Sequence, residues 1–402
     1  MRSDDHQQHR QIVECALVAV FAVYVLYFLT GFRFESLISG DSGQVDFRMW
    51  YLLPPQIKAQ DYPSVLSGNW LIPFPYLPSA VALMLPLSLM TQTVAFLVWI
   101  VLQAASFVIV VWTSLRLVGM HRSLLRLPIA AAAVFVVSAA IEWDFRTHNN
   151  NLIYLALVMV GLTTRKTWIA ALLFATTANL KLYSAVLIPG FLWRREYRLA
   201  FATALAATLL AIALPALVFG PDQSIKLFGS WLNEFLYTTS PAGQAAAPLS
   251  LQKTAGMILG VDPQSSTAIM AARCAQIVWM ALAAGYFVVT GRRRLADGDN
   301  SIARLCDVIV LLMLPLPLSS WLVPYHGVVL LPAFILIVSR LIDETCPQAV
   351  RIVAGVASMG CVALRFAVPA WDLRAGTLTL SLILTLLALG TIKMVDSRPD
   401  TL

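Results

Sequence analysis

Residues 166–193 read KTWIAALLFATTANLKLYSAVLIPGFLW, and basic residues flank this apolar stretch at 165–166 and 194–198. Basic residues beside membrane spans remain on the cytoplasmic side, so a single crossing would leave one of the two basic groups outside. The sequence therefore predicts two short helical legs that meet near NLKLY at 179–183. This interpretation sets the sidedness that we expect for the other apolar runs.

The composition of the chain excludes an ordinary soluble protein. Hydrophobic residues make up 59% of its 402 residues and charged residues 12%, against roughly 45–50% and about 25% in soluble domains. Such a chain cannot hide its apolar surface in one aqueous core, which predicts a single integral membrane domain over residues 1–402. Its net charge of +7 lies in loops beside anionic lipid and does not indicate nucleic-acid binding.

Apolar runs recur along the chain, and each predicts a helix because backbone groups in lipid must be hydrogen-bonded within their own segment. The runs lie at 12–30, 90–118, 127–142, 150–163, 168–192, 199–219, 268–290, 303–322, 326–341, 349–368 and 375–394. We interpret the first run as an uncleaved signal anchor and the proline-containing stretch 76–90 as an interfacial or re-entrant segment. The predicted fold is an all-α polytopic bundle of about 11–12 transmembrane helices in the plasma (inner) membrane, with both termini cytoplasmic.

Four polar stretches share the extracytoplasmic face under this topology. They are a long first loop at 31–75, a turn at 142–151, a second long loop at 221–267 and a turn at 319–327. The cytoplasmic loops are short and basic and carry few other groups able to do chemistry. A site built from the four outer stretches would face away from the cytosol.

Asp46 is the first candidate, in the stretch QVDFRMWY of the first loop. A carboxylate among apolar and aromatic neighbours can act as a general base if it is ionised and reaches an acceptor hydroxyl. Arg48, two residues further on, can pair with it or bind a phosphate. The alternative is a carboxylate that only caps a juxtamembrane helix.

The turn at 142–151, EWDFRTHNNN, is dense in hydrogen-bonding side chains for a membrane protein. Its candidates for binding a hydroxyl-rich or phosphate ligand are Glu142, Asp144, Arg146, His148, Asn150 and Asn151. The alternative is a hydrated turn that caps the next helix, for which two asparagines would suffice. In the second long loop, Ser250 and Gln252 are further candidates for binding sugar or acceptor.

Two other ionisable residues are candidates because of where they lie. Lys181 is in the middle of an apolar stretch, where an ionisable residue is costly and by default indicates function. It could hold a lipid phosphate or only a helix carbonyl. His326, in SSWLVPYHG, could contact a phosphate or transfer a proton, although a histidine at a membrane interface also serves structure.

Five motifs occur in one order along the chain: VDFRMWY, FPYLPSAVALMLPLSLM, NNNLIYLALVMVGL, TTANLKLYSAVLIPGFLWRREYR and SSWLVPYHGVVLL. Together they resemble GT-C glycosyltransferases that use polyprenyl-phosphate sugars, in particular the polyprenol-phosphate-mannose-dependent α-mannosyltransferase family. A Gly-Gln pair of that family is replaced here by His148-Asn149, and Leu182 replaces a proline. Four residues rather than two separate Trp321 from His326.

The resemblance, which covers roughly residues 12–340, implies specific roles. Asp46 would be the base that deprotonates an acceptor hydroxyl, and Lys181 and His326 would lie near the donor phosphate. Charge and sidedness add Arg48 and Arg146 as donor-phosphate ligands, and His148 is placed with them.

The function implied is an inverting transfer of a sugar from a polyprenyl-phosphate donor to a cell-envelope glycolipid or glycan. Mannose is expected from the resemblance, and arabinose or another pentose remains open. Cationic side chains would stabilise the leaving phosphate. We expect no cofactor and no metal, although Asp46 with Glu142 or Asp144 could hold one. The alternative is a multispan transporter or flippase of a lipid or sugar conjugate, because broken helices with charged residues also bind transported substrates.

Overall fold

The computed structural model describes residues 45–58, 76–239, 250–291, 301–318, 324–367 and 374–396, and every regular element in these ranges is a helix. Six apolar stretches in them are long enough to cross a membrane. They lie in α6 (Gln92–Leu117), α7 (Arg126–Thr147), α11 (Tyr197–Phe219), α15 (Ser266–Gly291), α16 (Ser301–Met313) with its extension η2 (Leu316–Leu318), and α19 (Arg374–Asp396). The predicted all-α polytopic fold is confirmed, while the number of crossings and their sidedness stay predictions.

The other helices are shorter. They are α3 (Val45–Lys58), α5 (Pro78–Ser88), α8 (Asn151–Thr163), α9 (Thr167–Leu180), η1 (Leu182–Val186), α10 (Leu187–Trp193), α12 (Pro221–Thr239), α14 (Leu251–Leu259), η3 (Pro324–Val329), α17 (Leu330–Ile342) and α18 (Gln348–Ala367). The predicted break near NLKLY is confirmed, because α9 ends at Leu180 and the backbone of Lys181 is extended, with φ −140° and ψ 98°. The predicted signal anchor at 12–30 lies outside the described residues.

Three predicted polar stretches are more helical than expected. The first long loop, predicted at 31–75, contains α3. The turn expected from residue 142 begins only after Thr147, because no proline or glycine interrupts α7 before that point. Glu142, Asp144 and Arg146 therefore lie on the last turns of a helix. The stretch 221–267, expected as a long loop, is folded over much of its length into α12 and α14. Its extracytoplasmic position stays a prediction.

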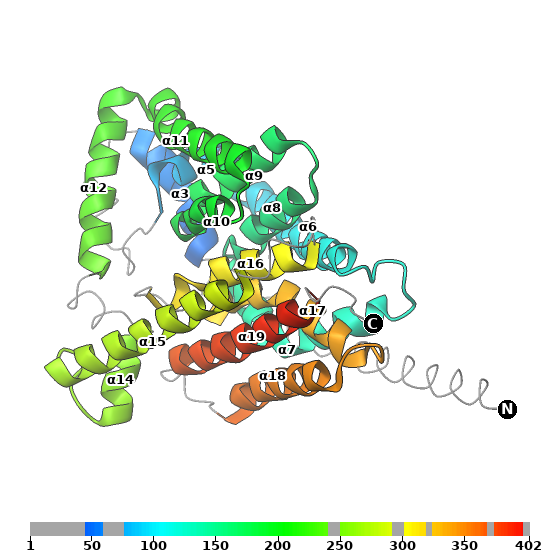
Figure 1. Cartoon of the computed structure of the whole chain (residues 1–402). Coiled ribbons are helices and arrows are strands. Elements are labelled where there is room, and N and C mark those ends of the chain that lie inside the picture. The colour runs from blue at the N-terminus through cyan, green and yellow to red at the C-terminus, as the bar shows by residue number, and fades with distance from the viewer. Residues whose placement is uncertain are drawn as a thin grey trace.

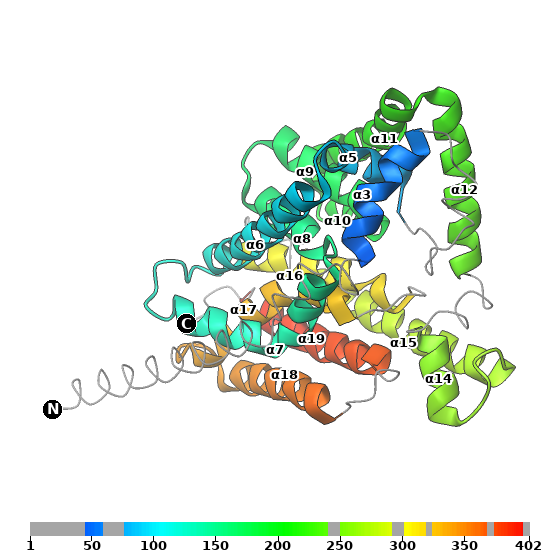
Figure 2. The ribbon, with the colours of Figure 1, turned by 180° about the vertical axis from the view of Figure 1, so that it is seen from behind.

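The helices form two packed groups with α6 and α16 between them (Figure 1). One group contains α5, α8, α9 and α11, and the other contains α7, α17, α18 and α19. Helix α6 contacts α8 of the first group and α7 and α17 of the second. Helix α16 contacts α17 and α19 of the second group and is linked to the first group by α10 and η1, which contact α11 and α9. Seen from behind, α3 lies along α5 at the edge of the first group (Figure 2), and it also contacts α6 and α7.

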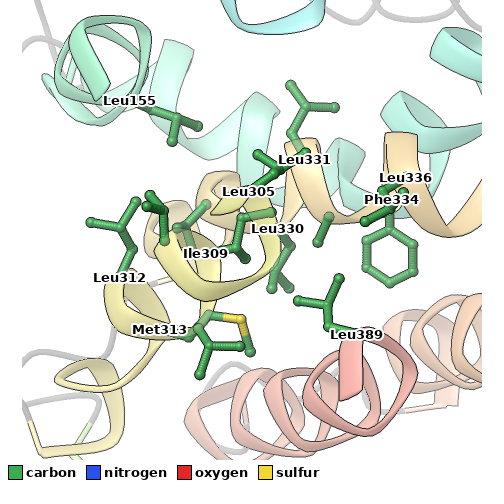
Figure 3. Close-up of a cluster of buried hydrophobic side chains, with 14 of the residues drawn as sticks. Leu155, Leu305, Ile309, Leu312, Met313, Leu330, Leu331, Phe334, Leu336 and Leu389 are labelled. Atoms are coloured by element: carbon green, nitrogen blue, oxygen red, sulfur yellow. The ribbon is translucent and has the colours of Figure 1, made fainter. Parts of the chain in front are cut away.

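A continuous apolar core fills the space around α16 and α17 (Figure 3). Leu305 and Ile309 of α16 pack with Leu331 and Phe334 of α17, and all four are buried. Helix α11 shows the opposite pattern, since Phe201, Leu205, Leu209 and Ile212 form an exposed apolar stripe at helical spacing. Such a face on a long helix is suited to lipid.

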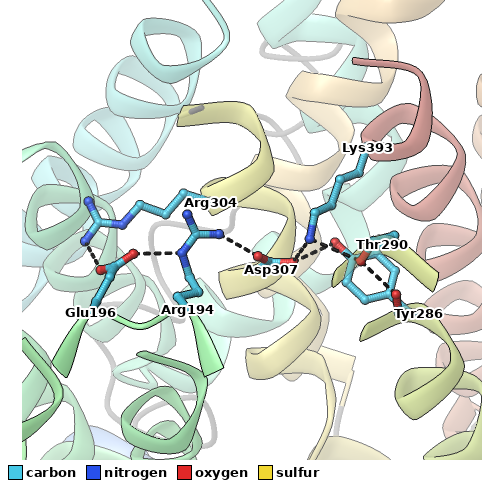
Figure 4. Close-up of polar contacts among 7 residues, drawn as sticks. All are labelled: Arg194, Glu196, Tyr286, Thr290, Arg304, Asp307 and Lys393. Atoms are coloured by element: carbon cyan, nitrogen blue, oxygen red, sulfur yellow. Dashed lines mark hydrogen bonds and ion pairs between the residues drawn. The ribbon is translucent and has the colours of Figure 1, made fainter. Parts of the chain in front are cut away.

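A buried charged network, which we call the Asp307 network, ties α10, α15, α16 and α19 together (Figure 4). Asp307 of α16 accepts a hydrogen bond of 2.5 Å from Arg194 and a short one from Lys393 of α19. Tyr286 donates to it over 3.2 Å. Glu196 forms ion pairs with Arg194 at 2.7 Å and with Arg304 at 2.8 Å. Each of these carboxylates thus contacts two cations directly, which neutralises charge that would be costly in an apolar interior.

Candidate active site

The site is built around the sharp turn between α7 and α8. His148 ends α7 in the left-handed region, with φ 53°, where non-glycine residues are rare. Helix α6 holds the turn in this conformation through the peptide carbonyls. Trp99 Nε1 donates to the His148 carbonyl over 2.9 Å, and Gln103 Nε2 donates to the Asn149 carbonyl over 2.8 Å. A strained turn that is fixed from outside in this way can present its side chains in a defined direction.

Asn149 is the centre of the site, because its side chain joins two buried charged groups from distant parts of the chain. Its Nδ2 donates to Asp46 Oδ2 over 2.7 Å. Its Oδ1 accepts from Lys181 Nζ at 3.1 Å and from the backbone N–H of Asn150 at 2.8 Å. The carboxylate and the ammonium are therefore held on either side of one neutral amide.

Asp46 reaches Asn149 because aromatic residues beside it anchor α3. Phe47 packs on Phe96 and Trp99 of α6, with ring centroids 5.1 and 6.2 Å apart. Trp50, one helical turn after Phe47, packs on Tyr76 at 4.3 Å. Positions three residues apart share a helix face, which explains the spacing of the two aromatic residues after Asp46.

Lys181 is buried and has a second polar contact with Tyr76, whose hydroxyl lies 3.1 Å from Nζ. The side chain leaves the chain at the break between α9 and η1, where the extended backbone directs it away from the helical path. An ammonium has three donors, and the two contacts within the described ranges leave one of them for a ligand.

The surroundings of Asp46 make its carboxylate a stronger base than that of an ordinary aspartate. Burial raises the pKa of this carboxyl, while the hydrogen bond from Asn149 and the positive charge of Lys181 lower it. The effect of burial is the largest, so the pKa of Asp46 remains above the ordinary value for an aspartate. A base with a raised pKa takes a proton more readily and can still be ionised when it is needed.

Asp144 and Asn151 support the same turn. Asp144 is buried in the last turn of α7, where Asn151 Nδ2 donates to it over 2.9 Å and the Leu152 backbone N–H over 3.4 Å. A carboxylate at this point caps the N-terminus of α8 and offsets its dipole. Asp144 and Lys181 also lie close enough for their charges to interact.

The two candidate histidines have different surroundings. The His148 ring packs edge-on against Phe96, and its Nδ1 lies 3.3 Å from Gln103 Oε1. Burial lowers the pKa of His148 to about 4, so the ring is neutral at neutral pH and supplies no positive charge to a phosphate. His326 is buried against Tyr183, with ring centroids 6.0 Å apart, and Lys181 is near enough to act on it electrostatically.

Five other predicted residues have contacts away from Asn149. Arg146 and Glu142 form an ion pair of 2.5 Å with each other on a part-exposed face of α7, and Arg48 is exposed on α3. Ser250 caps α14 by accepting from the backbone N–H of Lys253 at 3.0 Å, and Gln252 donates to the Pro263 carbonyl at 2.8 Å. Substrate contacts for these five stay predictions.

The structure gives Asn149, noted before only as one of the turn's asparagines, a central role, and it adds Tyr76, Trp99 and Gln103, which the sequence analysis missed. Asn149 and Tyr76 contact the charged groups directly, and Trp99 and Gln103 fix the turn. Tyr76 could have been found from the sequence, because it lies in the motif FPYLP. The described residues contain no group of three or more His, Cys, Asp or Glu side chains arranged to hold a metal ion.

Comparison with known proteins shows the family to which the chain belongs. Residues 74–315, more than half of the chain, match glycosyltransferase family 87. The matched segment includes Tyr76, Asn149, Lys181 and the whole α7–α8 turn, and it begins after Asp46 and ends before His326. No curated protein and no solved structure matches the chain. The chain is thus a membrane glycosyltransferase, and it belongs to glycosyltransferase family 87.

Proposed function

We propose that this enzyme transfers a sugar, with mannose expected, from a polyprenyl-phosphate donor to a hydroxyl of a cell-envelope glycolipid or glycan. The reaction takes place on the extracytoplasmic face of the plasma membrane. The observation that carries the proposal is the placement of Asp46 and Lys181 on either side of the Asn149 amide, with both charged groups buried. Membership of the family decides against the transporter or flippase alternative.

Asp46 is the general base in this proposal. Its carboxylate takes the proton of the acceptor hydroxyl while the hydroxyl oxygen forms a bond to the anomeric carbon of the sugar. Asn149 holds Oδ2 of Asp46, which leaves Oδ1 for the acceptor. One base is sufficient for a direct displacement, and attack from the face opposite the leaving group inverts the anomeric centre.

Lys181 acts on the leaving group. As the bond between the anomeric carbon and the phosphate oxygen breaks, its electron pair passes to the lipid phosphate. A buried ammonium near this oxygen stabilises the developing charge, and does so more strongly than it would in water. Tyr76 and Asn149 hold Nζ in place, so little reorganisation is needed during the reaction.

Asn150 supplies a binding group for a hydroxyl-rich substrate. It follows Asn149 in the turn, is fully buried, and neither atom of its side-chain amide has a hydrogen-bond partner within the described part of the chain. An unpaired buried amide costs on the order of 1–3 kcal/mol per missing bond. Sugar hydroxyls both donate and accept and would satisfy it.

The test is transfer by purified protein in vesicles that contain a polyprenyl-phosphate mannose donor and an envelope glycolipid fraction. We expect Asp46→Asn to lower kcat by about 10²–10⁴-fold, the range for loss of a general base. Asp222→Asn, which changes an exposed carboxylate on α12, is the matched control and should retain activity.

Two further donors sharpen the test. A polyprenyl-phosphate pentose shows which sugar is transferred. A nucleotide-activated mannose shows whether the donor must carry a lipid phosphate as its leaving group. Full activity of Asp46→Asn would remove Asp46 as the base. Activity with the nucleotide donor alone would contradict the proposed donor class.

A further inference from the structure

A second site lies at the opposite ends of the helices that carry the Asp46 site. Helix α8 begins at Asn151 in the active site and ends at Thr163, while α9 returns from Thr167 to Leu180, directly before Lys181. These helices have 13 and 14 residues, which corresponds to about 20 Å at about 1.5 Å per residue. At their far ends is a cavity of about 780 Å³. This volume is within the range of small-molecule sites, roughly 300–1,000 Å³.

The cavity is strongly basic. Five arginines from four separate parts of the chain line it: Arg116, Arg165, Arg195, Arg198 and Arg304. Glu196 is the one carboxylate among the described lining residues, and it is already bound by Arg194 and Arg304. The other four lining arginines form no ion pair within the described ranges. A concave surface with this excess of guanidinium groups is suited to an anion with several oxygen acceptors, and phosphate fits the planar donor pattern of arginine.

The backbone at Arg195 is an independent sign that the arrangement is functional. Arg195 has φ 60°, one of two non-glycine residues with positive φ in the described chain. The other is His148, at the active-site turn. Arg195 follows the end of α10, where the N–H of Glu196 bonds to the Phe191 carbonyl over 2.9 Å. Glycine is usual at this position of a helix end, and strained non-glycine residues cluster at functional sites, which favours a role for the Arg195 side chain.

Exposed aromatic residues place the cavity at the depth of lipid headgroups. Tyr197 lines the cavity and is 60% exposed, and Trp168 is 66% exposed beside the lining residue Thr167. Trp193, at the end of α10, is 51% exposed. Tryptophan and tyrosine concentrate where hydrocarbon meets the headgroup region, and basic residues near that level attract anionic lipids.

We propose that this cavity binds a phosphate-bearing anion, and that the anion is the headgroup of an anionic lipid in the leaflet opposite the Asp46 site. The site is separate from the transfer reaction and does not depend on the identity of its donor. The same chemistry would accept a soluble phosphate compound, so the experiment must distinguish the two sources.

The experiment measures binding of short-chain phosphatidic acid to delipidated full-length protein in detergent, by native mass spectrometry and by the shift in melting temperature. We expect the double variant Arg165→Gln/Arg198→Gln to weaken binding by at least about tenfold, because each arginine–phosphate pair is a charge-assisted hydrogen bond. The matched control is Arg122→Gln/Lys166→Gln, which removes the same charge from exposed residues that do not line the cavity. It should change binding less than about twofold.

Pyrophosphate, added without lipid, is the second arm. If pyrophosphate does not displace phosphatidic acid, the lipid assignment is supported. If it binds more tightly than the lipid, and the cavity variant alone loses this binding, the anion site is supported and the lipid assignment is overturned. Equal losses in the two double variants, or no loss in either, would overturn the site. Arg116→Gln is a second cavity variant in case the double variant does not fold.

Discussion

The Asp46 site and the Asp307 network are both buried clusters of charge, but their charges meet in different ways. In the Asp307 network the carboxylate contacts Arg194 and Lys393 directly. In the Asp46 site the Asn149 amide lies between the carboxylate and Lys181. Direct pairing uses the charge to join helices, whereas an intervening amide orients two charges and leaves each with capacity for a ligand. The same residue types therefore give a structural contact in one place and, in the mechanism that we propose, a reactive pair in the other.

The largest expected effect tests the structural side of this comparison. Asp307→Asn leaves Arg194 and Lys393 buried without their shared carboxylate, so we expect it to lower the stability by about 3–5 kcal/mol. Thermal unfolding monitored in detergent would measure this, with Asp222→Asn as the control. The fraction that remains folded should have kcat within about threefold of the wild type. Loss of kcat with unchanged stability would mean that the network takes part in catalysis.

Lys181→Met tests the reactive side. It keeps much of the buried chain length and removes the charge, so kcat should fall by about 10²–10³-fold through loss of stabilisation at the leaving phosphate. The melting temperature should change little, because the charge has no directly bonded carboxylate in the described structure. Steady-state transfer assays and thermal scans on one preparation separate the two effects. A large loss of stability with normal kcat would show that Lys181 has a structural role, as Asp307 does, and no role in catalysis.

Asn149→Ala removes the bridge and should change the pH dependence. The Asn149 hydrogen bond stabilises the ionised form of Asp46, so its loss raises the pKa of Asp46 further. Because the base must be ionised, the acid limb of kcat/KM should move to higher pH, with activity recovered as pH rises. A pH profile with an unmoved acid limb would disprove the role of the bridge. Gln103→Leu, which affects only the turn, should lower kcat without this displacement.

Tyr76→Phe is the smallest expected effect. It removes one hydroxyl, 3.1 Å from Lys181 Nζ, and keeps the ring that packs on Trp50. We expect a decrease in kcat of about fivefold, the size of one ordinary hydrogen bond, with KM almost unchanged. Tyr51→Phe is the control, because the Tyr51 hydroxyl, on α3, donates to the Met90 carbonyl and not to Lys181. A loss as large as that of Lys181→Met would mean that the hydroxyl contacts substrate.

The sequence predicted the helices well because apolar runs in a membrane protein report helices directly. The run at 199–219 matches α11, and the break at Lys181 followed from charge on both sides. The turn at 142–151 was expected too early because polar residues on the last turns of a helix resemble a loop. Asp46 and Lys181 were found because charged groups in apolar surroundings are conspicuous.

The sequence could not predict which side chains contact one another in the site. Asp46 and Asn149 are 103 residues apart, and Lys181 and Tyr76 are 105 apart. Contacts over such distances follow from helix packing and leave no periodic pattern. Arg194 was used only as a sign of membrane sidedness, and its buried partner Asp307 was not identified.

The shortness of α8 and α9 has a consequence for the surrounding membrane. Helices of about 20 Å are shorter than a hydrocarbon layer of about 30 Å, so either the bilayer around the protein is thinner or one end of this helix pair lies below the headgroups. In both cases the phosphate of a lipid-linked donor, as proposed above, would be brought closer to Lys181. Turnover should therefore rise in vesicles made from short acyl chains and fall in vesicles made from long ones.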